Sequence, residues 1–237
     1  MRQSQTIGVV IPALNEADAI GRVVGDIPAW VDRIVVADNG SKDGTGDVAR
    51  KAGAIVVRET EPGYGAACLA GIAALGNVDV IVFLDGDYSD HPEDMADLVD
   101  PILSGDHDFV IGSRATGARE AGSLTPQQLF GNWLATTLIR QIWGASYTDL
   151  GPFRAIRATS LAALAMADRN YGWTVEMQIK AAEHKLRSHE VPVRYRCRIG
   201  VSKVSGTIKG SVKAGYKILS IIGRHAVRRY ARPVAAN

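Results

Sequence analysis

The sequence predicts an α/β domain with a mainly parallel central sheet flanked by helices. Short β-branched runs alternate with helical patterns along the first half of the chain, and polar or charged residues follow directly after four of these runs. Such alternation is typical of sheets built from strand–helix–strand units. Ligands in these sheets bind beyond the carboxyl ends of the strands, so the residues that follow each strand are the first candidates for a functional site.

The individual elements follow from hydrophobic periodicity and from turn residues. Segment 80–84 is continuously apolar, as expected for a strand covered on both faces. Asn15 is expected to cap the first helix and Asp43 the second, and a loop is expected at 148–154. The predicted strands are 7–11, 34–37, 55–57, 80–84, 109–111 and 190–195. The predicted helices are 16–27, 45–52, 66–75, 95–103, 127–143, 175–184 and 207–229.

The composition indicates one packed globular domain over residues 1–237. Hydrophobic residues make up 46% of the chain and charged residues 22%, which is normal for a folded protein. We find no apolar run of the length that a signal peptide or a membrane span requires. Cys68 and Cys197 are far apart and form no CxxC motif, which favours a reducing cytoplasmic compartment.

The charge is distributed unevenly along the chain. Residues 1–190 carry 25 acidic and 16 basic residues, whereas the last 47 residues carry 11 Lys or Arg and no Asp or Glu. The acidic part is suited to a cation. The basic part is suited to phosphates or to an anionic membrane surface, or it forms a solvated basic helix and tail.

The predicted last helix is amphipathic. At about 100° per residue its basic side chains fall within a stripe roughly 100° wide, with the apolar residues on the other side. Such a helix either packs its apolar face on the domain or lies in a membrane interface, and the sequence leaves both readings open. The basic stripe consists of Lys209, Lys213, Lys217, Arg224 and Arg228.

Asp85 and Asp87 carry the strongest chemical signal, because they follow the buried strand 80–84 with one residue between them. Two carboxylates at this spacing can share one divalent cation, and oxygen ligands select Mg²⁺ or Mn²⁺. An EF-hand loop beginning at Asp85 is excluded, because Asp90 and Ala96 stand where Gly and Glu are required. A phosphatase with Asp85 as nucleophile also fits DxDxS, but we find no later acidic pair to bind its metal.

Polar groups after the other strands are suited to a nucleotide. Asn15, Glu16 and Asp38 can hydrogen-bond a nucleobase edge and ribose hydroxyls, although Asn15 also suits a helix cap. Gly65 allows close approach of the backbone. A basic cluster near the C-terminus suits phosphate binding, or it is an edge strand with outward-facing cations. This cluster consists of Arg194, Arg196, Arg198 and Lys203.

At these residues the sequence resembles family 2 glycosyltransferases of the GT-A fold, a Rossmann-like nucleotide-binding fold. It is most similar to the dolichol- and polyprenyl-phosphate mannosyl- or glucosyltransferases. The resemblance covers about residues 6–223 and rests on the motifs VIPALNE, DNGSKDGT, GYGAA, FLDGDYSDHPED, IGSR, TDLGPFRA, EVPVRY and RIGVSK. In these motifs, Ser89 replaces a polar amide that is frequent in the prenol-phosphate enzymes.

The resemblance implies a role for each matching residue. Asp85 and Asp87 would hold a metal ion, with Asp87 at the reaction centre, and Arg114 would orient a phosphate of the donor or acceptor. Arg198 and Lys203 would bind phosphate. The nucleotide pocket would be lined by Pro12, Ala13, Asn15, Glu16, Asp38, Gly65, Asp85 and Gly86.

Three functional hypotheses follow. The first is transfer of a hexose, with inversion, from a UDP- or GDP-sugar to polyprenyl phosphate. The second keeps this chemistry but uses a soluble hydroxyl acceptor, which needs a general base; Asp149 is the first candidate and Glu176 the second. The third is an inactive nucleotide-sugar sensor or membrane scaffold.

These hypotheses also imply how the chain is organised and which partners it has. A nucleotide-sugar-binding half is expected at about 6–125, an acceptor half at about 126–205, and a basic C-terminal helix and tail at 206–237. We expect a cytoplasmic enzyme that associates peripherally with the membrane and does not bind nucleic acid. Whether it forms a homodimer is left open.

Overall fold

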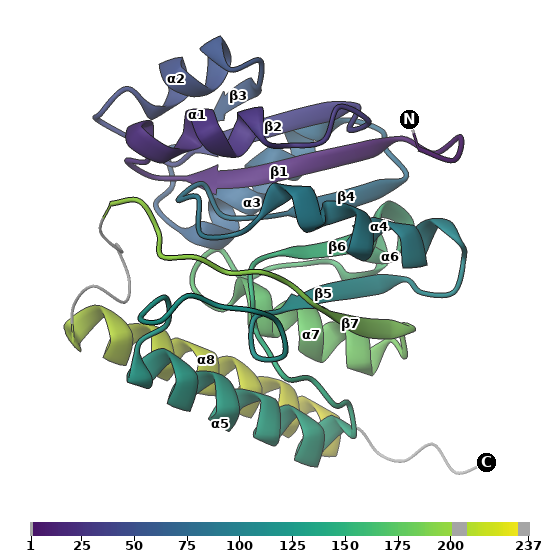
Figure 1. Cartoon of the computed structure of the whole chain (residues 1–237). Coiled ribbons are helices and arrows are strands. Elements are labelled where there is room, and N and C mark those ends of the chain that lie inside the picture. Colours follow the sequence, from purple (N-terminus) through teal and green to yellow (C-terminus); the bar gives the residue numbers. More distant parts are fainter. Residues whose placement is uncertain (1, 201–207, 232–237) are drawn as a thin grey trace.

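A single twisted sheet forms the centre of the protein, whose computed structural model describes residues 2–200 and 208–231 (Figure 1). The strand order is β3-β2-β1-β4-β6-β5-β7. Only β6 runs antiparallel to its neighbours, so the sheet is mainly parallel, as the sequence predicted. The strands are β1 (Ile7–Ala13), β2 (Arg33–Asp38), β3 (Ile55–Arg58), β4 (Val80–Phe83), β5 (Phe109–Ser113), β6 (Arg154–Arg157) and β7 (Ser188–Pro192).

Helices cover both faces of this sheet and create an apolar core on each side (Figure 1). One face is covered by α1 (Ala17–Gly25), α2 (Thr45–Lys51) and α4 (Met95–Leu103), with the short 3₁₀ helix η1 (Pro92–Asp94) before α4. The other face is covered by α3 (Tyr64–Leu75), α5 (Pro126–Trp143), α6 (Ala158–Leu164), α7 (Trp173–Glu183) and α8 (Ile208–Ala231). No helix within the described ranges is both long and apolar enough to cross a bilayer.

Strand β6 and helix α6 were not predicted, and β7 begins and ends earlier than the predicted strand 190–195. Segment 148–154 was expected to be a loop, but Arg154 begins a strand that is inserted between β4 and β5. Its sequence, RAIR, does not alternate between apolar and polar residues, and its first residue, Arg154, is completely buried. The last strand ends at Pro192, so the basic residues from Arg194 onward lie beyond it.

Capping of the first helix differs from the prediction. Asn15 does not cap α1; its Oδ1 accepts a hydrogen bond from the backbone N–H of Lys42 (2.8 Å). Asp43 instead serves both helices, because its carboxylate accepts from the backbone N–H groups of Ala17 and Thr45, the first residues of α1 and α2. This carboxylate therefore ties the segment after β1 to the segment after β2.

Strand register brings the candidate residues to one edge of the sheet. β1 pairs with β4 so that Val10 lies opposite Phe83. The segments that follow, with Glu16 after β1 and Asp85 after β4, therefore leave the sheet side by side. The strand β6, from the expected acceptor half of the chain, lies within the same sheet.

Candidate active site

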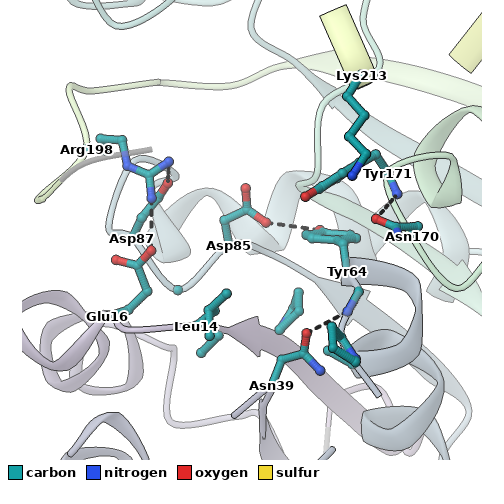
Figure 2. Close-up of a pocket in the computed structure, with 16 residues that line it drawn as sticks. Leu14, Glu16, Asn39, Tyr64, Asp85, Asp87, Asn170, Tyr171, Arg198 and Lys213 are labelled. Carbon is teal, nitrogen blue, oxygen red and sulfur yellow. Dashed lines mark hydrogen bonds and ion pairs between the residues drawn. The ribbon is translucent and has the colours of Figure 1, made fainter. Parts of the chain in front are cut away.

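A cavity of about 380 Å³ lies beyond the carboxyl ends of β1 and β4 (Figure 2). Its volume is in the range of small-molecule sites. Residues from the β1 end form one wall, the α3 N-terminus another, and Lys213 of α8 reaches in from above (Figure 2). The lining residues are Pro12, Ala13, Leu14, Glu16, Asn39, Pro62, Gly63, Tyr64, Ala67, Asp85, Gly86, Asp87, Asn170, Tyr171, Arg198 and Lys213.

The turn after β4 gathers three carboxylates. Asp87 Oδ1 accepts hydrogen bonds from the backbone N–H (2.9 Å) and the hydroxyl (2.6 Å) of Ser89. Asp90 Oδ2 accepts from the backbone N–H of Asp85 at 3.2 Å. The turn is therefore closed by its own side chains, and Ser89 holds Asp87 in place.

Burial and crowding perturb the protonation of Asp85 and Asp90. Burial, and then the charge of Asp87, raise the pKa of Asp85 to about 7. Burial and the charges of Asp85 and Asp87 raise the pKa of Asp90 well above its ordinary value. Strongly perturbed carboxyl groups in a cleft are typical of functional sites, and a bound cation would relieve this repulsion.

Arg198 connects the two acidic sides of the cavity (Figure 2). Its Nη1 lies 3.1 Å from Asp87 Oδ2, and its Nη2 lies 2.9 Å from Glu16 Oε1. The Nε of Arg198 is buried and has no hydrogen-bond partner within the described residues. This guanidinium therefore brings a positive charge to the edge of the cavity.

The acidic turn fits a divalent metal ion. Asp85 and Asp87 supply the oxygen ligands that Mg²⁺ and Mn²⁺ prefer, and Asp90 Oδ1 is buried without a hydrogen-bond partner in the described part of the chain. Within that part, no group of three or more Asp, Glu, His or Cys side chains could hold a metal ion. A metal on Asp85 and Asp87 would therefore need further ligands from a bound diphosphate and from water, as Mg²⁺ sites commonly do.

The N-terminus of α3 forms the wall opposite Arg198. The hydroxyl of Tyr64 donates to Asp85 Oδ1 at 3.0 Å. Gly63 and Gly65 pack against the backbone carbonyls of Arg169 and Asp168, where a Cβ at either glycine would clash. Gly65 thus serves to place the segment that carries Asn170 and Tyr171 at the cavity, and it does not line the cavity itself.

Arg114 and Asp149 form a buried ion pair behind the acidic turn. The guanidinium Nε and Nη2 of Arg114 bind the two carboxylate oxygens at 2.7 and 2.8 Å, and the Arg114 backbone N–H adds a third bond at 2.8 Å. Burial tends to raise the pKa of Asp149, but the charge and hydrogen bonds of Arg114 outweigh it, and the pKa lies below its ordinary value. Neither residue lines the cavity.

The structure separates the predicted site residues into two groups. Pro12, Ala13, Glu16, Asp85, Gly86, Asp87 and Arg198 line the cavity, whereas Asn15, Asp38, Gly65, Arg114 and Asp149 do not. Asp38 accepts from the backbone N–H of Ser41. Lys203 lies outside the described residues.

The other members of the basic cluster are engaged away from the cavity. Arg194 is ion-paired with Asp94 at 2.5 Å. Arg196 lies over the ring of Tyr88 at 3.5 Å and donates to the carbonyl oxygens of Tyr88 and Asp90. The cluster is therefore not a single phosphate site, and only Arg198 of its described members reaches the cavity.

Sequence reasoning overlooked several lining residues. Asn39 and Tyr64 lie inside motifs that the sequence analysis singled out, so their positions next to Asp38 and Gly65 were an available signal. Asn170 and Tyr171 follow no predicted strand and carry no motif. They reach the cavity only because the segment before α7 packs on the two glycines of α3.

Comparisons with known proteins agree on the family. The family model described as Glycosyl transferase family 2 matches residues 8–164. An uncharacterized glycosyltransferase of Mycobacterium tuberculosis is 35% identical over 210 residues, covering 88% of this chain and 94% of that protein. The undecaprenyl-phosphate mannosyltransferase of Micrococcus luteus is 32% identical over 217 residues, covering 85% and 88%. Glucosyl-3-phosphoglycerate synthase from M. tuberculosis, in a crystal structure with Mn²⁺, UDP-glucose and phosphoglyceric acid, is 25% identical with a TM-score of 0.70, covering 93% and 80%.

The fold and the acidic turn at the edge of its sheet define a glycosyltransferase of the GT-A class. The chain belongs to glycosyltransferase family 2. The family resemblance read from the sequence is therefore confirmed.

The pKa of Asp85 predicts how metal binding depends on pH. A folded-state pKa of about 7, above the ordinary value of 3.8, means that the metal-free fold favours the protonated carboxyl and loses stability as the pH rises between these values. A metal ion must displace this proton, so the affinity for Mn²⁺ should fall about tenfold per pH unit below pH 7 and level off above it. Calorimetric titration of Mn²⁺ with UDP or GDP across this range measures the effect.

Tyr64→Phe is the matched variant for this experiment. The Tyr64 hydroxyl lowers the pKa of Asp85, so removing it should move the change in affinity to higher pH. An affinity that stays constant between pH 5.5 and 7 would show that Asp85 does not titrate with the metal.

Proposed function

We propose that this enzyme transfers a hexose, with inversion, from a UDP- or GDP-sugar to a polyprenyl phosphate at the cytoplasmic face of a membrane. The convergence of the acidic turn with Arg198 and Lys213 on one cavity carries the proposal. The named M. luteus relative uses a lipid phosphate acceptor, and the named M. tuberculosis structure contains a nucleotide sugar with Mn²⁺, which supports the donor and metal classes.

Each wall of the cavity has a proposed role. Pro12, Ala13, Glu16 and Asn39 would contact the base and ribose, because they lie at or just after the carboxyl ends of β1 and β2, beside the acidic turn. Asp85 and Asp87 would hold Mg²⁺ or Mn²⁺. When bound, this ion would neutralise charge on the leaving diphosphate.

The two cations of the cavity complete the proposed mechanism. Arg198 has a buried donor that is not used within the described residues, and Lys213 points into the cavity from α8 (Figure 2). Both are suited to phosphate oxygens of the donor or the acceptor. A lipid phosphate is already anionic, so it can attack the sugar without giving up a proton to a base. Such an acceptor suits a cavity in which Arg198 lies beside the carboxylates of Asp87 and Glu16 and Lys213 reaches in from α8.

Transfer of labelled hexose from a set of UDP- and GDP-sugars to polyprenyl phosphate tests the proposal. We expect label in the lipid fraction with one donor, dependent on Mn²⁺ or Mg²⁺. Donor binding without transfer to any lipid would favour the soluble acceptor or the inactive sensor.

Asp149→Asn separates the lipid acceptor from the hydroxyl acceptor. Loss of a general base costs about 10²–10⁴ in rate. If Asp149 only positions Arg114, we expect kcat to fall about tenfold, because an amide still accepts one of the Arg114 hydrogen bonds. Steady-state kinetics with the best donor measures kcat, and titration of the donor should show unchanged affinity. A fall of more than about 10³ would assign Asp149 as the base instead.

A further inference from the structure

Helix α8 is apolar on two separate faces. Its buried face, with Ile221, Ile222 and His225, packs on the core beside α5 and α7. On the opposite side, four large side chains remain in solvent: Tyr216 (75% exposed), Leu219 (44%), Val227 (68%) and Tyr230 (73%). At 100° per residue they fall within an arc of about 80°. We call these four residues the apolar face of α8.

A basic stripe borders this apolar face. Lys213, Arg224 and Arg228 lie on the adjacent arc of the helix and are exposed. Lys217, on the same arc, is ion-paired with Asp168 at 2.7 Å. Residues 208–231 contain no Asp or Glu. An exposed apolar stripe beside a basic one is the pattern of helices that bind anionic membrane surfaces.

The neighbouring helix α5 adds exposed aromatic side chains. Phe130 and Trp133 are 61% and 59% exposed, and their ring centroids lie 5.8 Å apart. Helices α5 and α8 lie side by side at one side of the molecule (Figure 1). Tryptophan and tyrosine favour the boundary between lipid and water, so these two helices concentrate the side chains that such a boundary accepts.

We propose that the apolar face of α8 and its basic stripe bind the surface of an anionic lipid bilayer. Charge complementarity favours a bilayer over a second copy of the chain. In a symmetric dimer that pairs two α8 helices antiparallel across this face, both basic stripes would meet and repel. An anionic bilayer accepts the apolar side chains between its headgroups and attracts the cations at the same time.

The relevance of this surface to the reaction rests on the proposed function, in which the acceptor is a lipid held in the membrane. Lys213 lines the donor cavity, and Tyr216 lies one helical turn further along α8. A bilayer against the apolar face would therefore lie beside the cavity mouth, and a membrane-embedded acceptor could present its phosphate without leaving the lipid.

Sedimentation with vesicles of phosphatidylcholine, with or without phosphatidylglycerol, tests whether this surface binds an anionic bilayer. We expect the wild-type protein to pellet with the anionic vesicles. The double variant Tyr216→Ser/Tyr230→Ser should bind at least about tenfold more weakly. Ile55→Ser is the matched control, because Ile55 is 51% exposed on β3, at the edge of the sheet farthest from β7. This variant should bind vesicles as the wild type does.

A second pair of variants tests the basic stripe. Arg224→Gln/Arg228→Gln should lose the preference for anionic vesicles, whereas Arg50→Gln, at an exposed arginine of α2, should keep it. Absence of binding to anionic vesicles would overturn the proposal. So would a dimer, seen by sedimentation equilibrium, that the double tyrosine variant dissociates.

Transfer to polyprenyl phosphate in detergent distinguishes the two proposals. If the double tyrosine variant loses vesicle binding but transfers hexose in detergent, both proposals stand. If the wild type transfers hexose in detergent but does not bind vesicles, only the surface proposal fails. If it binds vesicles but transfers nothing in detergent, the proposed function fails and the surface stands.

Discussion

Asp87→Asn is expected to abolish metal-dependent binding of the nucleotide and to lower kcat by about 10³ or more. A metal ion contributes several kcal/mol to stabilising charge on the leaving group, and about 1.4 kcal/mol corresponds to each factor of ten in rate. Asparagine keeps the oxygen that accepts from Ser89 but removes the negative charge that a cation and Arg198 both require. The loss is therefore electrostatic and leaves the turn closed.

Calorimetric titration of UDP and GDP, each with and without Mn²⁺, measures this effect together with a transfer assay. Asp47→Asn is the control, because Asp47 is an exposed carboxylate on α2 and should change neither quantity. A variant that binds nucleotide with Mn²⁺ as tightly as the wild type would remove Asp87 from the metal site. The phosphatase hypothesis, which places its nucleophile at Asp85, would then need a direct test.

The position of the acidic turn could be predicted because it depends on strand topology alone. A buried apolar strand followed by Asp85 and Asp87 places both carboxylates at the carboxyl edge of a parallel sheet, whatever the rest of the chain does. Pro12, Ala13 and Glu16 were located in the same way, because they lie at or just after the end of the neighbouring strand.

Other residues escaped prediction because their surroundings are set by distant segments. Asp38 ends a strand, but its side chain turns to the backbone of Ser41, and its neighbour Asn39 lines the cavity. Arg194 and Arg198 are four residues apart and chemically alike, yet one meets Asp94 and the other Asp87. Sequence spacing cannot show which acidic partner comes from a segment about 100 residues away.

The strand β6 was missed for a physical reason of the same kind. A short run with arginine at both ends does not have the pattern of a central strand. Arg154 is nevertheless fully buried, because backbone carbonyls surround its guanidinium: it donates to the carbonyl oxygens of Leu150, Gly151 and Thr174. Burial of this cation lowers its pKa to about 10, so it remains charged at neutral pH.

Arg154→Met should therefore lower the free energy of unfolding by roughly 3–5 kcal/mol, which is a large part of the stability of an ordinary domain. Methionine fills similar volume but leaves the buried carbonyl groups of Leu150 and Gly151 without this donor, and each unpaired group costs about 1–3 kcal/mol. Relief of the buried charge offsets part of this cost. Urea unfolding monitored by circular dichroism measures the change.

Arg157→Met, in the same strand, is the matched control. Arg157 is partly exposed and donates one hydrogen bond, to the carbonyl oxygen of Ile102, so we expect a loss of only about 1 kcal/mol. Equal losses of unfolding free energy in the two variants would mean that the hydrogen bonds from Arg154 to the surrounding carbonyl oxygens add no particular stability. A larger loss at Arg154 is the expected result, because its guanidinium bonds the carbonyl oxygens of Leu150 and Gly151, which follow directly after Asp149.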